Sequence, residues 1–206
     1  MNRFSEVDEF IDTNQNIRPE FSKGALNKFD EILDDVKRKI EGDKYGEMGK
    51  KCLLVINDMA EQFDTHNWEA YSPDKRAEVL DNLAKRIGKE CGVEIKGVRF
   101  FGFPPYNRGY VNGDGYIYLH DSHIKDPKLK EDALGVVCHE ARHVFQKTAV
   151  KNPNAFDVDE KTIAKWKDNF DNYLSAEKFG YYRYFTQPVE VDARAFSEYV
   201  VKKKEW

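Results

Sequence analysis

The chain has few cysteines, and those present form no pairing pattern. Cys52, Cys91 and Cys138 are odd in number and widely spaced along 206 residues. This excludes a disulfide framework and a zinc site built from paired thiols. We expect three buried, reduced thiols, which are typical of a protein in a reducing compartment.

Long apolar runs and clustered basic residues are also lacking. No stretch approaches the about 20 apolar residues of a membrane span, and residues 1–20 do not contain the apolar core of a signal peptide. The 33 basic residues are mixed with 37 acidic ones, for a formal net charge of −4. We therefore expect a cytoplasmic protein that binds neither nucleic acid nor membrane. The sequence indicates no oligomeric state.

The composition is that of an ordinary globular protein, with 40% apolar and 34% charged residues. Its length fits a single domain over residues 1–206. Residues 1–92 form a helical N-terminal portion in this prediction. Apolar spacing predicts a helix at 21–40 and another at 51–63. The Ser72-Pro73 pair predicts the start of a third helix, since serine caps helices and proline suits the first helical position.

The pattern changes at Val93, and residues 93–206 are expected to form a sheet followed by helices. Period-two alternation over Val93–Phe100 predicts a strand, and so does the aromatic and β-branched run Tyr116–Leu119. The turn residues Asn112–Gly115 separate them, so we predict a small antiparallel sheet within residues 93–120. The fold class is then α+β, with further helices expected at 133–150, 159–174 and 187–200.

The run His139-Glu140-Ala141-Arg142-His143 lies in the predicted helix 133–150. Histidines four residues apart project from the same helix face and can share one tetrahedral metal ion, for which zinc is well suited. Glu140 follows the first histidine, so its carboxylate can take a proton from the attacking water and deliver it to a leaving amine. The alternative is a pair of ordinary helix histidines beside an incidental glutamate.

A catalytic zinc site needs a third protein ligand, and Glu190 is the leading candidate. It lies in the first turn of the predicted helix 187–200, and the small residues Ala193 and Ser197 on its face would let this helix approach the metal helix closely. The alternative is that Glu190 only serves the helix N-terminus, where an acidic residue is favoured.

Three other residues are candidates for the third ligand. His120 and His123 lie upstream, where a turn or surface role is expected for both. Asp192 lies about 200° around the helix from Glu190, so the two carboxylates cannot face one ion. We expect Asp192 to be a structural hydrogen-bond partner near the site.

The two predicted helices resemble those of the gluzincin class of zincin metallopeptidases, in which a metal-binding helix is followed by a second helix that donates a glutamate. The run Glu190-x-x-Ala193-x-x-Phe196 is similar to the ligand helix of ImmA/IrrE-type peptidases and of zincin domains common in phages and bacterial mobile elements. The resemblance covers roughly residues 93–200. It implies a zincin-like fold, one Zn²⁺ per chain and hydrolysis of a peptide or protein substrate.

The resemblance also implies supporting residues. The strand Tyr116, Ile117, Tyr118 and Leu119 sits where zincins carry the edge strand that pairs with an extended peptide. Such a hydrolase needs a donor for the developing oxyanion, and the candidates are Tyr181, Tyr182, Tyr184 and Arg194. Gln146, one turn after His143, is expected to line the cleft.

Two other functions remain open at this point. One is a toxin or effector whose zincin chemistry acts on a single host protein. The other is a non-catalytic interaction domain in which the metal is structural or absent.

Overall fold

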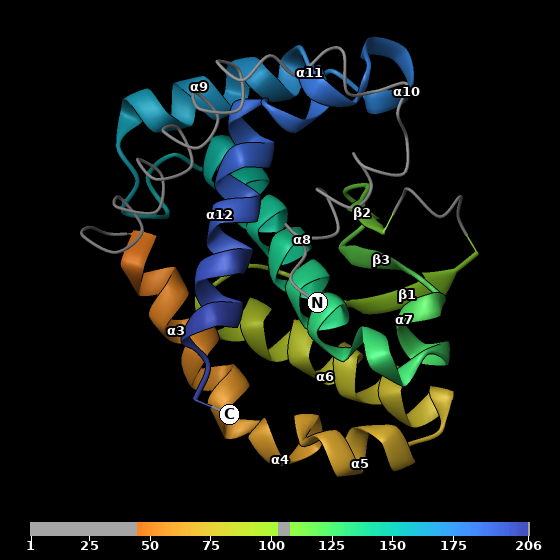
Figure 1. Cartoon of the computed structure of the whole chain (residues 1–206). Coiled ribbons are helices and arrows are strands. Elements are labelled where there is room, and N and C mark those ends of the chain that lie inside the picture. Colours follow the sequence, from red (N-terminus) through yellow and green to blue (C-terminus); the bar gives the residue numbers. More distant parts are fainter. Residues whose placement is uncertain (1–44, 103–107, 206) are drawn as a thin grey trace.

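The computed structural model describes residues 45–102 and 108–205. The helix predicted at 21–40 lies outside the described residues. Within them the fold is α+β, as expected, with helices surrounding a small three-stranded sheet at one side of the molecule (Figure 1).

Helices dominate the part of the chain that precedes the sheet. They are α3 (Tyr45–Asp58), α4 (Ala60–Phe63), α5 (Thr65–Ala70) and α6 (Pro73–Cys91). The segment predicted as one helix at 51–63 is helical but is divided between α3 and α4. The predicted start of α6 is confirmed, because the Ser72 hydroxyl accepts a hydrogen bond from the backbone N–H of Lys75 at 3.2 Å. Gly92 ends α6 with a φ of +70°, which glycine adopts at little cost.

The sheet is mixed, so the prediction of an antiparallel sheet is wrong. Strands β1 (Gly97–Phe101), β2 (Gly109–Val111) and β3 (Tyr116–His120) lie in the order β1-β3-β2. β3 is antiparallel to β2, as the turn at Asn112–Gly115 predicts, but it is parallel to β1. Turn residues show that two successive segments reverse direction, but they do not determine where a third strand inserts. Here β3 inserts between β1 and β2.

The two faces of β3 have different surroundings. Ile117 and Leu119 are fully buried, and β3 packs against α8. Tyr116 and Tyr118 point to the opposite face because side chains alternate along a strand. There the Arg99 guanidinium lies 3.7 Å from the centre of the Tyr116 ring.

Two long helices follow the sheet, and they carry the residues predicted to bind metal. These are α8 (Lys130–Lys151) and α12 (Pro188–Lys203). The short elements α7 (Ser122–Lys125) and η2 (Pro127–Leu129) precede α8, and α9 (Glu160–Asp171), α10 (Ala176–Phe179) and α11 (Tyr181–Phe185) connect it to α12. The helix predicted at 159–174 ends at Asp171, which leaves Tyr173 outside a helix.

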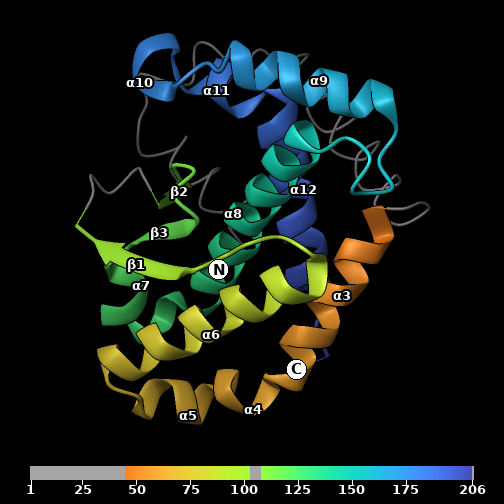
Figure 2. The ribbon, with the colours of Figure 1, turned by 180° about the vertical axis from the view of Figure 1, so that it is seen from behind.

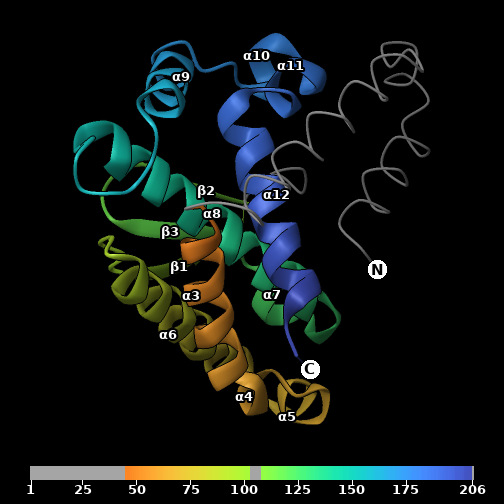
Figure 3. The same cartoon turned by 90° about the vertical axis from the view of Figure 1, so that its left-hand side faces the viewer.

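Helix α8 runs through the middle of the described structure (Figures 1 and 2). It packs against α6, α9, α12 and the strands β2 and β3, and for this reason most of its residues from Ala133 to Gln146 are buried. Helix α3 lies beside α12 (Figure 3). A single hydrophobic cluster contains residues from both portions of the chain, such as Phe63 and Leu83 with Val137 and Phe196.

Two compositional expectations can be compared with the described residues. Cys52, Cys91 and Cys138 are all buried and free of disulfides, as predicted. Within residues 45–102 and 108–205, no helix combines the length and the apolar character needed to cross a membrane.

Candidate metal centre

Two imidazoles and one carboxylate meet where α8 passes the first turn of α12. His139 Nε2 and His143 Nε2 are 3.1 Å apart. Glu190 places Oε2 at 3.4 Å from His139 Nε2 and Oε1 at 3.3 Å from His143 Nε2. The exposed fractions of the three residues are only 3%, 7% and 2%. The three residues predicted as metal ligands are therefore brought together in one buried group.

The spacing of these atoms fits a metal ion. Ligand atoms that lie about 2.0–2.1 Å from a tetrahedral zinc ion are about 3.3 Å apart along each edge of the tetrahedron. The separations of 3.1, 3.3 and 3.4 Å agree with that edge. The donor set of two imidazoles and a carboxylate is also one that zinc accepts. His139, His143 and Glu190 can therefore hold a metal ion together.

Local sequence explains how each donor reaches this point. The four-residue spacing of His139 and His143 stacks the two imidazoles on one face of α8. Glu190 follows Pro188, which occupies the first position of α12. Ala193 and Ser197, one and two turns further on, are buried and small, which permits the close contact between α12 and α8.

Burial and the neighbouring charges shift the pKa values of His143 and Glu190 in opposite directions. Burial disfavours a charged imidazole, but the adjacent Glu190 carboxylate outweighs this and, with Glu140, raises the pKa of His143 above its ordinary value of 6.5. Burial also works to raise the pKa of Glu190, but the two imidazoles hold that pKa well below its ordinary value of 4.5. Glu190 is consequently ionised at neutral pH, and its negative charge can attract a cation.

Glu140 lies beside the donors and is itself buried, with 4% of its surface exposed. Its negative charge contributes to the raised pKa values of His143, Tyr173 and Tyr184. It also opposes the effect of burial, which lowers the pKa of Lys147. The carboxylate therefore acts electrostatically on the groups that surround the candidate metal centre.

Tyr173 is a site residue that the sequence did not reveal. Its hydroxyl donates a hydrogen bond to Glu190 Oε1 at 2.7 Å. Gln187 holds the adjacent residue Leu174 in place, because its amide oxygen accepts from the N–H of Leu174 at 2.7 Å and its amide nitrogen donates to the carbonyl of Leu174 at 2.8 Å. Tyr173 lies in a segment predicted to be helical, and no local pattern connects it to Glu190.

The predicted oxyanion donors occupy different places. The Arg194 guanidinium lies 3.4 Å from Glu190 Oε2 and also donates to the carbonyl of Phe185, so it contacts the ligand carboxylate directly. Tyr184 is in edge contact with the ring of Tyr173, with ring centres 6.3 Å apart. Tyr181 packs against Tyr184 and Phe185.

The prediction that Tyr116, Ile117, Tyr118 and Leu119 form an edge strand is wrong. They belong to β3, which is central because it pairs with β1 and β2 on its two sides. Its backbone hydrogen-bonding groups are therefore directed at neighbouring strands. The order of strands in a sheet depends on contacts between distant segments, so the position of a strand in the chain does not reveal whether it lies at an edge.

The edge strand next to α8 is β2. A Cβ atom at Gly109 would lie 2.7 Å from Val136 Cγ1 of α8, and Lys147 Nζ donates to the carbonyl of Val111 at 3.0 Å. β2 thus runs along the part of α8 that carries the two histidines. The backbone groups of Gly109 and Val111 point away from β3, because the N–H of His120 pairs with the carbonyl of Arg108 and bonded positions alternate.

The other histidines considered as ligands are engaged elsewhere. His123 is buried, with Nε2 at 2.7 Å from Asp132 Oδ2 and Nδ1 at 2.9 Å from the carbonyl of His120. His120 Nδ1 lies 2.8 Å from the Ser122 hydroxyl. Neither histidine belongs to the donor group. Cys138, adjacent to His139, is fully buried, and burial raises the pKa of its thiol to about 12.

Asp192 and Gln146 belong to a connected set of contacts that ends at His143. Asp192 pairs with Arg142 and accepts a hydrogen bond from Gln146, and Gln146 in turn contacts His143 Nδ1. Gln146 was expected to line the cleft, but it is fully buried.

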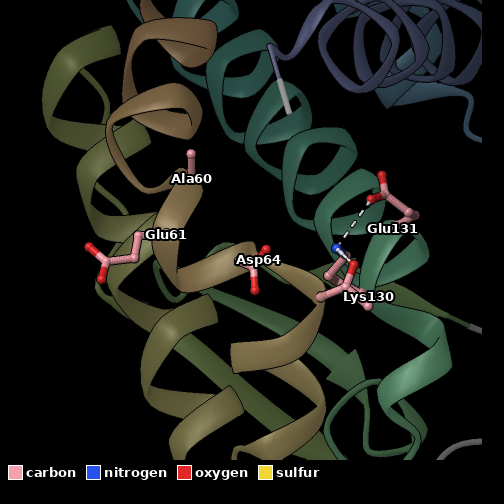
Figure 4. A pocket seen from close by; sticks show the side chains of 6 residues that line it. Ala60, Glu61, Asp64, Lys130 and Glu131 are labelled. Carbon is pink, nitrogen blue, oxygen red and sulfur yellow. Dashed lines mark hydrogen bonds and ion pairs between the residues drawn. The ribbon is translucent and has the colours of Figure 1, made fainter.

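A hollow of about 500 Å³ lies away from this centre, between the α4–α5 region and the start of α8 (Figure 4). It is lined by Ala60, Glu61, Asp64, Thr65, Lys130 and Glu131. Lys130 Nζ donates to the carbonyl of Phe63 and contacts the Thr65 hydroxyl, at 2.7 and 3.0 Å. His139, His143 and Glu190 are not among the residues that line the hollow.

Comparisons of this chain with protein families, with curated proteins and with solved structures give no match.

Proposed function

We propose that this protein is a zinc-dependent hydrolase of the zincin class and that its reaction is peptide hydrolysis. The observation that supports this most strongly is the buried triangle of His139, His143 and Glu190, whose donor atoms have the spacing of zinc ligands. The glutamate next to the first histidine supplies the acid–base group that such a reaction requires.

The number of donors favours catalysis over a structural metal. Structural zinc sites have four protein ligands, whereas catalytic sites have three and keep one position for water or substrate. Among the described residues, the donor group at this centre has three members. A zinc ion held here by these three side chains would retain an open position.

The chemistry divides between the ion and the side chains. When bound, a zinc ion would supply Lewis acidity that polarises a carbonyl and brings the pKa of water toward neutrality. Glu140 would accept the proton of the attacking water and later give it to the leaving amine. Tyr173 donates its hydroxyl proton to Glu190 Oε1 and would thereby hold that carboxylate in place as a ligand.

An extended peptide would bind along β2 in this proposal. The outward N–H and carbonyl groups of Gly109 and Val111 can pair with a substrate backbone as an added strand. The carbonyl of Val111 already accepts from Lys147, so a substrate would share or displace that contact. In this proposal β2 is the edge strand that pairs with the substrate, the role expected from the sequence for Tyr116–Leu119.

A second candidate is an effector that cleaves a single host protein. It is favoured by the burial of the centre, since the donors and Glu140 are at most 7% exposed. Access limited in this way selects against general substrates. The two candidates use the same residues and differ only in the range of proteins cleaved.

The first test is metal content. We expect about one zinc per chain in purified wild-type protein by mass spectrometry, and a much lower content in Glu190→Ala. Tyr199→Phe, on α12 but outside the centre, serves as the control and should match the wild type. Equal zinc in the wild type and Glu190→Ala would show that Glu190 is not a ligand. No zinc in the wild type after reconstitution would contradict the proposed function.

The second test is catalysis, with a library of peptides made by digesting a bacterial proteome as the probe. Glu140→Gln should retain zinc and lose about 10²–10⁴-fold in hydrolysis, because general acid–base catalysis contributes about that much. Cleavage sites found by mass spectrometry in the wild type would then disappear in the variant. Full activity of Glu140→Gln would exclude the proposed role. Cleavage in a single intact protein, with none in the library, would favour the effector.

A further inference from the structure

Gln146 makes a set of contacts that determines how its amide is oriented. Its Nε2 atom lies 3.1 Å from the carbonyl of Val189 and 2.6 Å from Asp192 Oδ2. Both partners can only accept hydrogen bonds, so the atom that faces them must be the NH₂ group. The remaining amide atom, Oε1, lies 2.8 Å from His143 Nδ1. An amide oxygen only accepts, and the donor in this contact must therefore be His143 Nδ1–H.

Asp192 keeps this orientation because a buried arginine holds it. Arg142 Nε lies 2.8 Å from Asp192 Oδ2, and Arg142 Nη2 lies 3.1 Å from Asp192 Oδ1. This two-pronged pairing suits the planar guanidinium and fixes the orientation of the carboxylate oxygens, which accept hydrogen bonds. The Arg142 side chain is fully buried. The rings of Phe145, Trp166 and Phe196 lie 5.0–5.4 Å from its guanidinium.

We infer that Gln146 is a positioning residue that selects the tautomer of His143 with the proton on Nδ1 and the lone pair on Nε2. The lone pair then faces His139 and Glu190, as metal binding requires. In the opposite tautomer, an Nε2–H would occupy the direction of the ion, and a lone pair on Nδ1 would face the amide oxygen at 2.8 Å. The inference rests on the proposed metal-binding function but can be measured without metal.

The chain Arg142–Asp192–Gln146–His143 links α8 to α12 behind the centre. Both helices must be in place before His143 presents its lone pair, because Asp192 and Val189 belong to α12. Gln146 thereby couples the tautomer of His143 to the placement of α12, the helix that supplies Glu190.

The first experiment compares zinc affinity by competition with a chromophoric chelator, using the full chain. Gln146→Met keeps the length of the side chain and removes its hydrogen bonds. We expect its zinc affinity to fall by about 10- to 100-fold, as is usual when the partner of a ligand histidine is removed. Val200→Ala, which loosens the buried side of α12 without touching the four linked residues, should bind zinc like the wild type. Equal affinity of Gln146→Met and wild type would overturn the inference, as would an equal loss in Val200→Ala.

The second experiment reads the tautomer directly and needs neither metal nor a variant that folds. In the metal-free wild-type chain with ¹⁵N-labelled histidine, NMR at an alkaline pH where the ring is neutral should show the proton of His143 on Nδ1. A proton on Nε2 would overturn the inference. If the wild type failed to bind zinc, the proposed function would fall, while this spectrum would still decide the role of Gln146. In folded Gln146→Met, the Nε2–H tautomer should become populated.

Discussion

Glu190 is the residue on which most contacts of the centre converge. Its carboxylate faces both imidazoles, accepts a hydrogen bond from Tyr173 and lies beside Arg194. A carboxylate that served only the start of α12 would face backbone N–H groups instead. The surrounding donors hold the buried charge in place, so the Glu190 carboxylate is fixed facing the two imidazoles.

The hydrogen bond from Tyr173 to Glu190 leads to a prediction about zinc affinity. In Tyr173→Phe the ligand carboxylate loses its hydrogen bond at Oε1, and we expect zinc affinity to fall about tenfold. Chelator competition measures this change. Tyr199→Phe, which removes a hydroxyl elsewhere on α12, is the matched control. Unchanged affinity in Tyr173→Phe would show that the hydroxyl does not orient the ligand.

The pKa shifts of two residues predict how the metal-free protein responds to pH. Because the pKa of His143 is raised in the folded state, its contribution to stability is fully present below 6.5 and is lost as the pH rises through the raised pKa. Because the pKa of Glu190 is lowered, its contribution is present above 4.5 and is lost as the pH falls through the lowered pKa. The pair therefore stabilises the metal-free fold most between pH 4.5 and 6.5.

Urea unfolding across a pH series, with a chelator present, measures this profile. Glu190→Gln removes the charge on which both shifts depend, so its profile should be flatter than that of the wild type on both sides of the maximum. Parallel profiles for the two proteins would contradict the assignment of the pH dependence to this pair.

Helices α8 and α12 are joined by an ion pair in the core. Arg142 is fully buried, and Asp192 is 7% exposed. Buried pairs of this kind contribute little net stability, but removing one partner leaves an uncompensated charge in the interior. We expect the pair to act mainly by making the relative placement of α8 and α12 specific.

Asp192→Ala tests this connection between elements. We expect it to destabilise the protein by about 3–5 kcal/mol, because the buried Arg142 guanidinium loses its two hydrogen bonds to the Asp192 carboxylate. Equilibrium unfolding in urea gives the value. Asp171→Ala breaks an exposed pair with Lys167 on α9 and should leave the unfolding midpoint almost unchanged. A loss in Asp192→Ala no larger than in Asp171→Ala would mean that the interior tolerates Arg142 without the Asp192 carboxylate.

For the whole molecule, metal binding and folding should be linked. The three donors come from two helices that meet only in the folded chain, so a zinc ion held by them would bind the native state in preference to the unfolded one. At a free zinc concentration about 100 times the dissociation constant, the native state gains about 2.7 kcal/mol. For a chain of this size, that corresponds to a rise of about 5–10 °C in Tm.

Thermal unfolding with and without zinc checks this linkage. The rise should vanish on addition of a chelator and should be absent in Glu190→Ala, whose metal-free Tm provides the reference. A rise of equal size in Glu190→Ala would place the stabilising zinc at another site.

Much of the centre is predictable from sequence because its patterns are local. The positions of α6, α8 and α12 follow from apolar spacing, a serine cap and proline at the first helical position, all of which act within about one turn. The four-residue spacing of His139 and His143 places both on one helix face, whatever the rest of the fold does. Glu190 was a candidate for the same reason, since it opens a helix with small neighbours.

The remaining features depend on contacts between segments that are distant in sequence. Tyr173 meets Glu190 only because α9 ends early, and Gln146 meets Asp192 across 46 positions of the chain. The insertion of β3 between β1 and β2 likewise depends on how the sheet packs against α6 and α8. By itself the sequence determined α8 and α12, the start of α6 and the identity of the three candidate donors. Tertiary packing decided which edge strand adjoins the centre and which side chains hold the ligands, because such contacts form only when distant surfaces are buried together.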